Sequence, residues 1–453
     1  MTRLTVVAFN TNIDIYSGPS GLLLAHRLLQ SRSLPLKKID VFESRPDPRD
    51  VQKKKLGGRA YALGLGVRGR TAIRSCDEEL WSAVKKRGFE CERFRLYFSS
   101  KINIKLRDRD DAVEPSVLIY QTDLCSALLE EMDRRDSASV NVHFDSNITH
   151  VDLESSAIFV EEDRKGPYDL IVGCDGSNSI VRSALQTYSP PNTFSFKQRK
   201  LLPGCFKVAR IETMPPLMDP ESVGLMLPET KSLGITAFVE PTVGGGACIL
   251  FAGRLSNADD DTTKTQDSDV QETGLGSILF PRHGSKTERE SQPDIGNITV
   301  LILDHFPLLE GTPGLDDLVQ QLLSQRTSVA DSVKCNIYNS NTDVTATAIC
   351  GDAAHATGGV SGQGCNSALM NSVALADCLV QHYQPHACGD TVEKTKRAML
   401  HQSVSSYSHK AVPVGWAFTT YPLAMTEKRC QFLEILGQLY PIPLTPYSEE
   451  DSA

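Results

Sequence analysis

Apolar runs alternate with glycine-rich turns at three distant places along the chain. Residues 4–8, 169–173 and 348–350 are each predominantly apolar, and runs of this length bounded by turn signals predict buried strands. A helix is expected after the first run, over residues 18–29, and leads to a further strand at 38–43. A long helix rich in small residues is expected from Gly364 to about residue 379.

The middle of the chain has a different pattern. Short strand-like runs follow one another between residues 187 and 339, at 207–211, 235–239, 247–251 and 298–303. Strands in succession predict a mainly antiparallel sheet. Between them, residues 256–275 are strongly acidic and poor in apolar residues, which predicts a disordered loop. From residue 391 onward the pattern predicts helices broken by prolines.

Two adjacent motifs near residue 350 carry candidate chemistry. The third apolar run ends in Gly351-Asp352, and Gly362, Gln363, Gly364, Cys365 and Asn366 then open the long helix. An Asp can accept hydrogen bonds from a ribityl hydroxyl, and a glycine-rich helix start offers free N–H groups and a positive dipole to a ring that becomes anionic. This pair of motifs therefore predicts a flavin site.

The N-terminal helix opens like a dinucleotide-binding loop. Gly18, Ser20 and Gly21 lie in the first turn of the expected helix, and Glu43 ends the next strand at the distance expected for binding a ribose. Tyr16 stands where the first glycine of the motif is expected. Either residues 13–16 replace residues 4–8 as the strand, or the stretch is a gene-model error that hides an intact loop.

A second Asp-Gly turn follows the run at 169–173. It contains Asp175 and Gly176, and Arg182 lies on the helix that follows. Together with Gly351-Asp352, this order of motifs resembles the FAD-dependent aromatic hydroxylases, flavoprotein monooxygenases of the para-hydroxybenzoate hydroxylase type. In that family the Asp-Gly segment lies near the flavin and the pyridine nucleotide, and the Gly-Asp segment binds the ribityl chain.

The resemblance implies an α/β (α+β) fold in which the three segments converge on one FAD. Residues 1–72, 102–186 and 340–385 would form a discontinuous Rossmann-like FAD-binding domain with a parallel sheet. Residues 73–101 and 187–339 would form the antiparallel substrate domain, and 386–453 a C-terminal helical region.

The resemblance also implies the reaction. NAD(P)H would reduce the flavin, and O2 would add to it to form a C4a-hydroperoxide that hydroxylates a small aromatic substrate. A second G-x-G-x-x-G motif is not visible, so NAD(P)H is expected to bind transiently, without a Rossmann domain of its own.

Within the family, the kynurenine 3-monooxygenase group resembles the chain most. The similar segments are residues 58–65, 68–72, 93–96 and 333–335. The resemblance implies that Arg93 and Tyr407 hold the carboxylate of an aromatic amino acid, assisted by Asn366. It also implies that Arg59 and Gln121 lie beside the FAD.

Two departures from the family pattern concern the flavin site. Residues 358–361 read Gly-Gly-Val-Ser where the family has a proline, and Asn371 followed by Ser372 replaces an acidic residue. His355, beside the Gly-Asp turn, is interpreted as a structural residue that orients the loop beneath the flavin.

Composition narrows the remaining choices. The chain has 453 residues and a net charge of −9, which suits a large enzyme of two or more domains and argues against nucleic acid as a partner. Its 12 cysteines are scattered without a C-x-x-C pair, so we expect no metal and a reducing, cytoplasmic location. A transmembrane helix or a targeting segment is not expected.

Two alternatives stay open at this point. One is a flavoprotein reductase or epoxidase of the same superfamily that acts on a lipid and touches an organelle membrane through its C-terminal residues 432–436. The other is an inactive homologue that binds FAD weakly. Flavin halogenases are disfavoured because the only tryptophans, Trp81 and Trp416, do not form a Trp-x-Trp motif.

Overall fold

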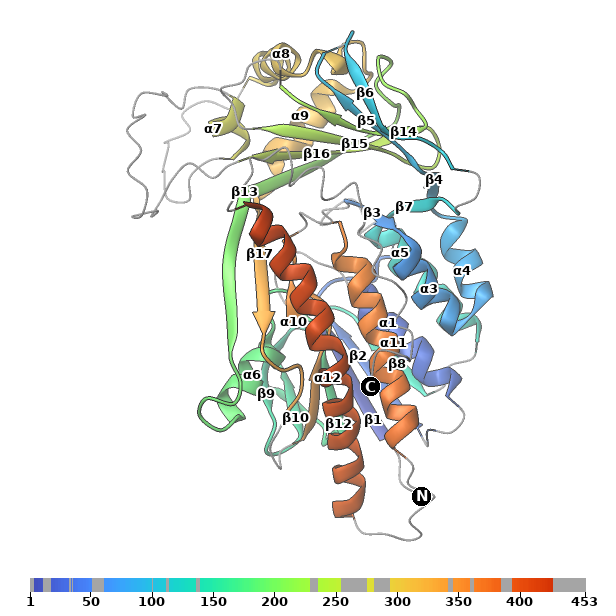
Figure 1. Ribbon diagram of the computed structural model, residues 1–453, viewed down its shortest axis with the longest axis vertical. Coiled ribbons are helices and arrows are strands. Elements are labelled where there is room, and N and C mark those ends of the chain that lie inside the picture. The colour runs from blue at the N-terminus through green and yellow to red at the C-terminus, as the bar shows by residue number, and fades with distance from the viewer. Residues whose placement is uncertain are drawn as a thin grey trace.

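The computed structural model describes most of the chain (Figure 1). The described residues are 4–10, 18–31, 34, 36–50, 61–99, 101–110, 114–135, 139–228, 235–253, 275–280, 294–340, 345–358, 362–383 and 393–426. The predicted disordered loop at 256–275, Tyr16, Arg59 and residues 432–436 lie outside these ranges, apart from Leu275, the first residue of a short helix.

A five-stranded parallel sheet forms the lower layer (Figure 1). Its strands run in the order β18 (Ala346–Ile349), β12 (Leu170–Gly173), β1 (Leu4–Asn10), β2 (Leu36–Glu43) and β8 (Val140–His143). Every neighbouring pair is parallel. The predicted α/β fold with a parallel sheet is confirmed, and residues 4–10 form the central strand.

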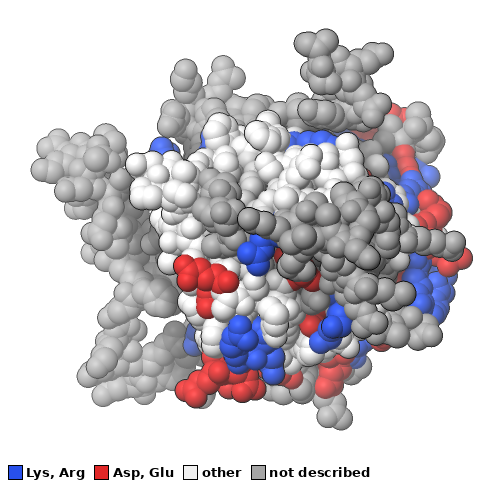
Figure 2. Space-filling model, turned by 90° about the horizontal axis from the view of Figure 1, so that it is seen from below, with Lys and Arg blue, Asp and Glu red and all other residues white. Residues whose placement is uncertain are grey.

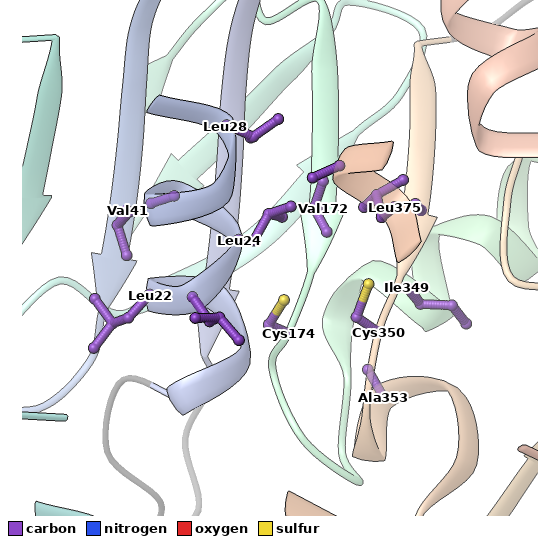
Figure 3. Packing of buried hydrophobic residues seen from close by; sticks show 14 of the residues in the cluster. Leu22, Leu24, Leu28, Val41, Val172, Cys174, Ile349, Cys350, Ala353 and Leu375 are labelled. Atoms are coloured by element: carbon purple, nitrogen blue, oxygen red, sulfur yellow. The ribbon is translucent and has the colours of Figure 1, made fainter. Parts of the chain in front are cut away.

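Helices pack on this sheet through apolar faces. α1 (Pro19–Gln30) contacts α5 (Gln121–Arg134), α11 (Gly364–His382) and α3 (Val67–Cys76), and α4 (Glu78–Lys85) lies beside α3 and α5. Leu22, Leu24 and Leu28 of α1 are fully buried and belong to one core with Val41 and Val172 of the sheet (Figure 3). Truncating one such leucine to alanine typically costs about 2–5 kcal/mol.

Smaller elements complete the lower layer. α6 (Ile180–Tyr188) follows β12 and packs on β9 (Ile148–Asp152), which pairs with β10 (Ala157–Val160) and then β11 (Asp163–Lys165). A second three-stranded sheet, β3 (Ala62–Leu65), β7 (Ser116–Tyr120) and β4 (Phe89–Cys91), lies between the lower layer and the upper one (Figure 1).

A seven-stranded, mainly antiparallel sheet forms the upper layer, as predicted. Its order is β17 (Ser328–Cys335), β13 (Phe196–Ile211), β16 (Ala247–Gly253), β15 (Thr236–Pro241), β14 (Ser222–Met226), β5 (Arg93–Tyr97) and β6 (Asn103–Arg107). Only β14 and β5 pair in parallel among these strands of the described chain. α7 (Leu275–Leu279), α8 (Ile295–His305), the short helix Pro307–Leu309 and α9 (Leu315–Ser324) share a buried cluster with one face of this sheet.

The strand predicted at residues 298–303 is wrong, because this run lies inside α8. Ile298 and Ile302 are buried, whereas Val300 between them is 57% exposed. Buried positions four residues apart share one face of a helix. Asp294 caps the helix by accepting a hydrogen bond from the Gly296 N–H at 3.0 Å, a start signal that the run of apolar residues obscured.

The C-terminal prediction of helices broken by prolines is also wrong over the described residues. α12 spans Glu393–Thr426 as one helix and packs against β17, β18, α10 (Asp352–His355) and α11 (Figure 1). Pro413 is exposed, as is His409 one turn earlier. Water can therefore reach the carbonyl that loses its helical partner at the proline, and the helix continues.

Charge is mixed on the surface shown in Figure 2. Lys and Arg side chains lie interspersed with Asp and Glu side chains on this face. None of the helices in the described residues is long and apolar enough to span a bilayer. The same residues hold no cluster of three or more His, Cys, Asp or Glu side chains that could bind a metal.

Candidate active site

The three acidic residues predicted to surround one cofactor lie at the same edge of the parallel sheet. In its register, Phe42 of β2, Phe9 of β1, Gly173 of β12 and Ile349 of β18 lie side by side. Glu43, Asp175 and Asp352 follow within one to three residues. The outer two strands are three strand spacings apart, about 15 Å, and ligands of open α/β sheets bind at this carboxyl edge.

Glycine is required at the Gly351-Asp352 turn. Gly351 has φ +58° and ψ −137°, and a Cβ there would lie 2.8 Å from the Cβ of Ala368 in α11. The Gly351 N–H donates to Asn371 Oδ1 at 3.3 Å, and His355 Nε2 lies 2.5 Å from the same oxygen. Asn371, which replaces the family's acidic residue, thus holds the turn and the buried His355 in place.

Asp352 lies against the start of α11. A Cβ on Gly364 would be 3.6 Å from Asp352 Oδ1. Burial raises the pKa of Asp352 to about 6, although the side chain keeps partial exposure. Gly362, two residues before α11, has φ +61° and open space around it.

Two of the helices that begin at this edge have no side-chain cap, a property that they share with α3, α5 and α9. No side chain caps α1, which starts after Gly18, or α11, which starts after Gln363. In contrast, side chains of Asp77, Ser179 and Asp294 cap α4, α6 and α8. Uncapped N–H groups and the positive end of the dipole therefore point to the carboxyl edge, where an anionic group can bind. These starts and Asp352 fit an FAD.

Asn366, predicted to assist in binding the substrate, is hydrogen-bonded within the protein. Its Oδ1 accepts from the N–H groups of Gly66 (3.0 Å) and Gly69 (3.1 Å), and its Nδ2 donates to the carbonyls of Gly64 (2.8 Å) and Gly362 (3.4 Å). An amide side chain makes four such bonds at most. Asn366 is therefore saturated by the protein, which argues against direct binding of a substrate.

The Asp-Gly turn is clamped to the Gly-Asp turn. Asp175 Oδ2 accepts from the N–H groups of Ile180 (2.7 Å) and Val181 (3.2 Å) at the start of α6, and Gly176 has φ +76°. The buried Arg182 donates to the carbonyls of Ala353 (2.9 Å) and Ser177 (2.6 Å). Arg182 thus joins the segments after β12 and β18, and Asp175 fixes the turn to the start of α6.

Some side chains of the N-terminal motif are hydrogen-bonded to other parts of the protein. Ser20 Oγ donates to the Ala368 carbonyl at 3.1 Å and lies 2.7 Å from Ser372 Oγ, so it binds α1 to α11. The buried Gly21 lies in the first turn of α1. Glu43 Oε1 accepts from the Arg45 N–H at 3.0 Å.

From the sequence, no role at the site was assigned to Arg45, Tyr61 or Arg68. Arg45 and Asp352 both lie within electrostatic range of the Tyr61 hydroxyl, and the Tyr61 ring meets Phe206 edge-on with centroids 6.5 Å apart. The Gln121 N–H donates to the Tyr61 carbonyl at 3.4 Å. Arg68 donates to Gln363 Oε1 at 3.4 Å. Each lies within or beside a quoted motif, and that proximity was the available signal.

Arg93 and Tyr407 are both bonded to other groups of the protein. Arg93 is half-buried on β5 and pairs with Glu221 and with Asp108 (3.4 Å). Tyr407 is fully buried in α12, and its hydroxyl donates to the Ile349 carbonyl at 3.0 Å. These contacts argue against the predicted substrate-binding roles. Cys365 is partly exposed beside Asp352.

The chain resembles curated enzymes over most of its length. It is 28% identical over 383 residues to the kynurenine 3-monooxygenase of Stenotrophomonas maltophilia (strain K279a), covering 81% of this chain and 71% of that protein. It is 26% identical over 384 residues to the kynurenine 3-monooxygenase of Salinispora tropica, covering 82% and 72%. No protein-family model matches the chain.

Solved structures share the fold at low identity. The tetrameric form of 2-methyl-3-hydroxypyridine-5-carboxylic acid oxygenase superposes with a TM-score of 0.62 at 14% identity, covering 98% of both chains. PqsL of Pseudomonas aeruginosa, in complex with 2-aminobenzoylacetate, superposes with a TM-score of 0.61 at 17% identity, covering 96% of this chain and 99% of PqsL.

Proposed function

We propose that this chain, an FAD-dependent monooxygenase of the aromatic hydroxylase family, hydroxylates kynurenine or a closely related aromatic amino acid with NAD(P)H and O2. The observation that carries the proposal is the convergence of Asp352, the uncapped start of α11 and Tyr61 beneath the upper sheet. The scattered cysteines suit a reducing compartment, so the proposal places the enzyme in the cytoplasm.

In this proposal, different residues at the carboxyl edge bind different parts of the FAD. The Asp352 carboxylate would accept a hydrogen bond from a ribityl hydroxyl, and the N–H groups in the first turn of α11 would stabilise negative charge on the reduced ring. Glu43 and the start of α1 would hold the adenosine ribose and the phosphates. When bound, the flavin supplies the activation of O2, after reduction by NAD(P)H.

The side chains of this protein would contribute to the reaction by orienting the substrate ring and by excluding water from it. Tyr61 and Phe206 meet between the two layers, and Val208 and Leu250 extend the apolar surface of the upper sheet beside them. A flat aromatic ring held against these side chains is oriented and shielded from water. None of these side chains has to transfer a proton.

The choice of substrate is supported by the comparisons. The curated relatives are named for kynurenine, and PqsL was solved with 2-aminobenzoylacetate. Kynurenine carries the same 2-aminobenzoyl group. An aminobenzoyl ring is therefore the common feature of the ligands to be tried.

The test begins with the purified protein, which is expected to be yellow, with the absorption bands of oxidised flavin. Under anaerobic conditions, kynurenine is expected to speed bleaching by NADPH or NADH at least about tenfold, the size of effect that ligand-dependent assembly of a site can give. Asp352→Asn is expected to retain less flavin, because an amide is a weaker acceptor than a carboxylate.

Ser367→Ala serves as the matched control for this site. Its hydroxyl is buried in α11 without a hydrogen-bond partner among the described residues, so flavin content should not change. A colourless protein would contradict the proposal. A yellow protein that no aromatic compound affects would instead favour the lipid reductase or epoxidase.

A further inference from the structure

The upper sheet presents two faces of different character. Along β15, Ala237 and Val239 are fully buried in the cluster that contains α8 and α9. Successive side chains of a strand point to opposite faces. Phe238 and Glu240 therefore lie on the other face, which is turned toward the lower layer, and both are partly exposed.

Glu240 interrupts an otherwise apolar part of this face. It pairs across the sheet with Cys248 of β16, which in turn pairs with Arg210 of β13. In the neighbouring row, Phe238 pairs with Leu250, and Leu250 pairs with Val208. A carboxyl group therefore stands beside the apolar surface that the proposed function assigns to the aromatic ring.

The same row connects Glu240 to the candidate flavin site. The Cys248 thiol bonds to the backbone of Ala62 and lies within electrostatic range of Glu240. Tyr61 directly precedes Ala62 in the chain, and its hydroxyl is in electrostatic range of Asp352. Glu240 therefore lies close to the candidate flavin site, because Cys248 and Tyr61 lie between it and Asp352.

Within the described part of the chain, no cation balances Glu240. Its carboxyl makes no ion pair and no hydrogen bond among these residues, and the nearby Arg210 guanidinium lies 3.6 Å above the Tyr120 ring instead. The other titratable groups in range are Cys248, Tyr120 and Cys91, none of them cationic. Although Glu240 keeps partial exposure, the packing around its carboxyl group raises its pKa to about 8, as expected for a poorly solvated carboxyl without a partner.

We propose that Glu240 binds the ammonium group of the substrate and so makes the enzyme selective for aromatic amino acids over aromatic acids that lack the amine. The inference rests on the proposed function. A cation placed beside Glu240 compensates the buried carboxylate, whereas a carboxylate placed there would be repelled. The amino-acid end of the substrate would therefore lie toward Glu240 and its ring toward Leu250 and Tyr61.

The experiment compares kynurenine with its desamino analogue, 4-(2-aminophenyl)-4-oxobutanoate, on the flavin-loaded protein. A second pair is tryptophan and 3-(indol-3-yl)propanoate. Dissociation constants come from the change in the flavin absorption spectrum. The ammonium-bearing member of at least one pair is expected to bind about 10–100-fold tighter, the range for a charge-assisted hydrogen bond.

Glu240→Gln is expected to remove this preference by weakening the amine-bearing ligand alone, with the analogue unchanged within about twofold. Glu212→Gln removes an exposed carboxylate just beyond the end of β13 and should leave both constants unchanged. Unchanged flavin content and melting temperature establish that Glu240→Gln is folded.

Each other outcome overturns the inference. If wild type binds both members of every pair equally, or if Glu240→Gln weakens both members alike, Glu240 does not recognise an ammonium group. If aromatic acids without an amine are hydroxylated and amino acids are not, the monooxygenase activity stands while this inference falls. A protein without flavin would refute the proposed function itself, and the inference with it.

Discussion

At the scale of the residue, the amide of Asn366 determines the local structure around the start of α11. Three glycines from the segment after Tyr61 bond to this side chain, namely Gly64, Gly66 and Gly69. A Cβ on Gly69 would lie only 2.5 Å from Asn366 Oδ1. The short segment and the helix therefore depend on one another.

Replacing Asn366 by alanine should destabilise the protein by about 2–4 kcal/mol, because buried backbone donors lose their acceptor and each unsatisfied group costs about 1–3 kcal/mol. Chemical unfolding followed by circular dichroism measures the change. Ser367→Ala, one residue away, should be neutral because its buried hydroxyl has no partner among the described residues. Equal losses in the two variants would contradict this account of Asn366.

At the scale of the element, the packing of α1 on α5 contains a titratable group. His26 of α1 is 2% exposed, and its Nε2 lies 2.7 Å from the Leu128 carbonyl of α5. Burial lowers the pKa of His26 from 6.5 to about 4. The interface is therefore compatible with the neutral imidazole and opposed to the cation.

This pKa predicts acid sensitivity. The unfolded chain binds a proton to His26 between pH 6.5 and about 4, whereas the folded protein does not. Stability should thus be complete above pH 6.5 and fall by up to about 3 kcal/mol as the pH drops through this window.

Urea unfolding at several pH values measures the effect. His26→Gln keeps an N–H donor for Leu128 but cannot titrate, so its stability should depend less on pH over this range. The same slope in both proteins would show that His26 does not control the loss.

At the scale of the whole molecule, α12 closes the structure beside both sheets. It packs on β17 of the upper sheet and β18 of the lower one. Trp416 Nε1 donates to the Cys335 carbonyl at 2.7 Å. Gly415, next to it, lets α12 approach so closely that a Cβ would lie 2.0 Å from the Tyr338 hydroxyl and 2.8 Å from the His355 ring.

Gly415→Ala should therefore lower the stability by about 1–3 kcal/mol, the usual cost of overpacking. It should also weaken flavin retention, since His355 supports the Gly-Asp turn through Asn371. Gly276→Ala in α7 is the control, because its Cβ would meet only Ile235 at 3.7 Å. Thermal unfolding and flavin absorbance test both; a neutral Gly415→Ala would refute the proposed close approach.

Much of the fold could be read from the chain. The buried strands are marked by apolar runs, and the order of Gly-Asp, Asp-Gly and N-terminal motifs predicted the parallel sheet and a resemblance to the FAD-dependent aromatic hydroxylases. The run at 298–303 could not be assigned in this way, because a short, fully apolar run lacks the periodicity that separates a helix from a strand. Only the packing of Ile298 and Ile302 on the upper sheet made it a helix.

The residues of the candidate site could likewise be predicted only in part from the sequence. From sequence one can predict which motifs would bind a flavin, because strand ends and glycine turns are local properties. The tertiary structure alone decided which side chains are already occupied. Asn366, Arg93 and Tyr407 are held by partners far away in the chain. Glu240 is placed on the inner face by a pairing register that no short stretch of sequence encodes.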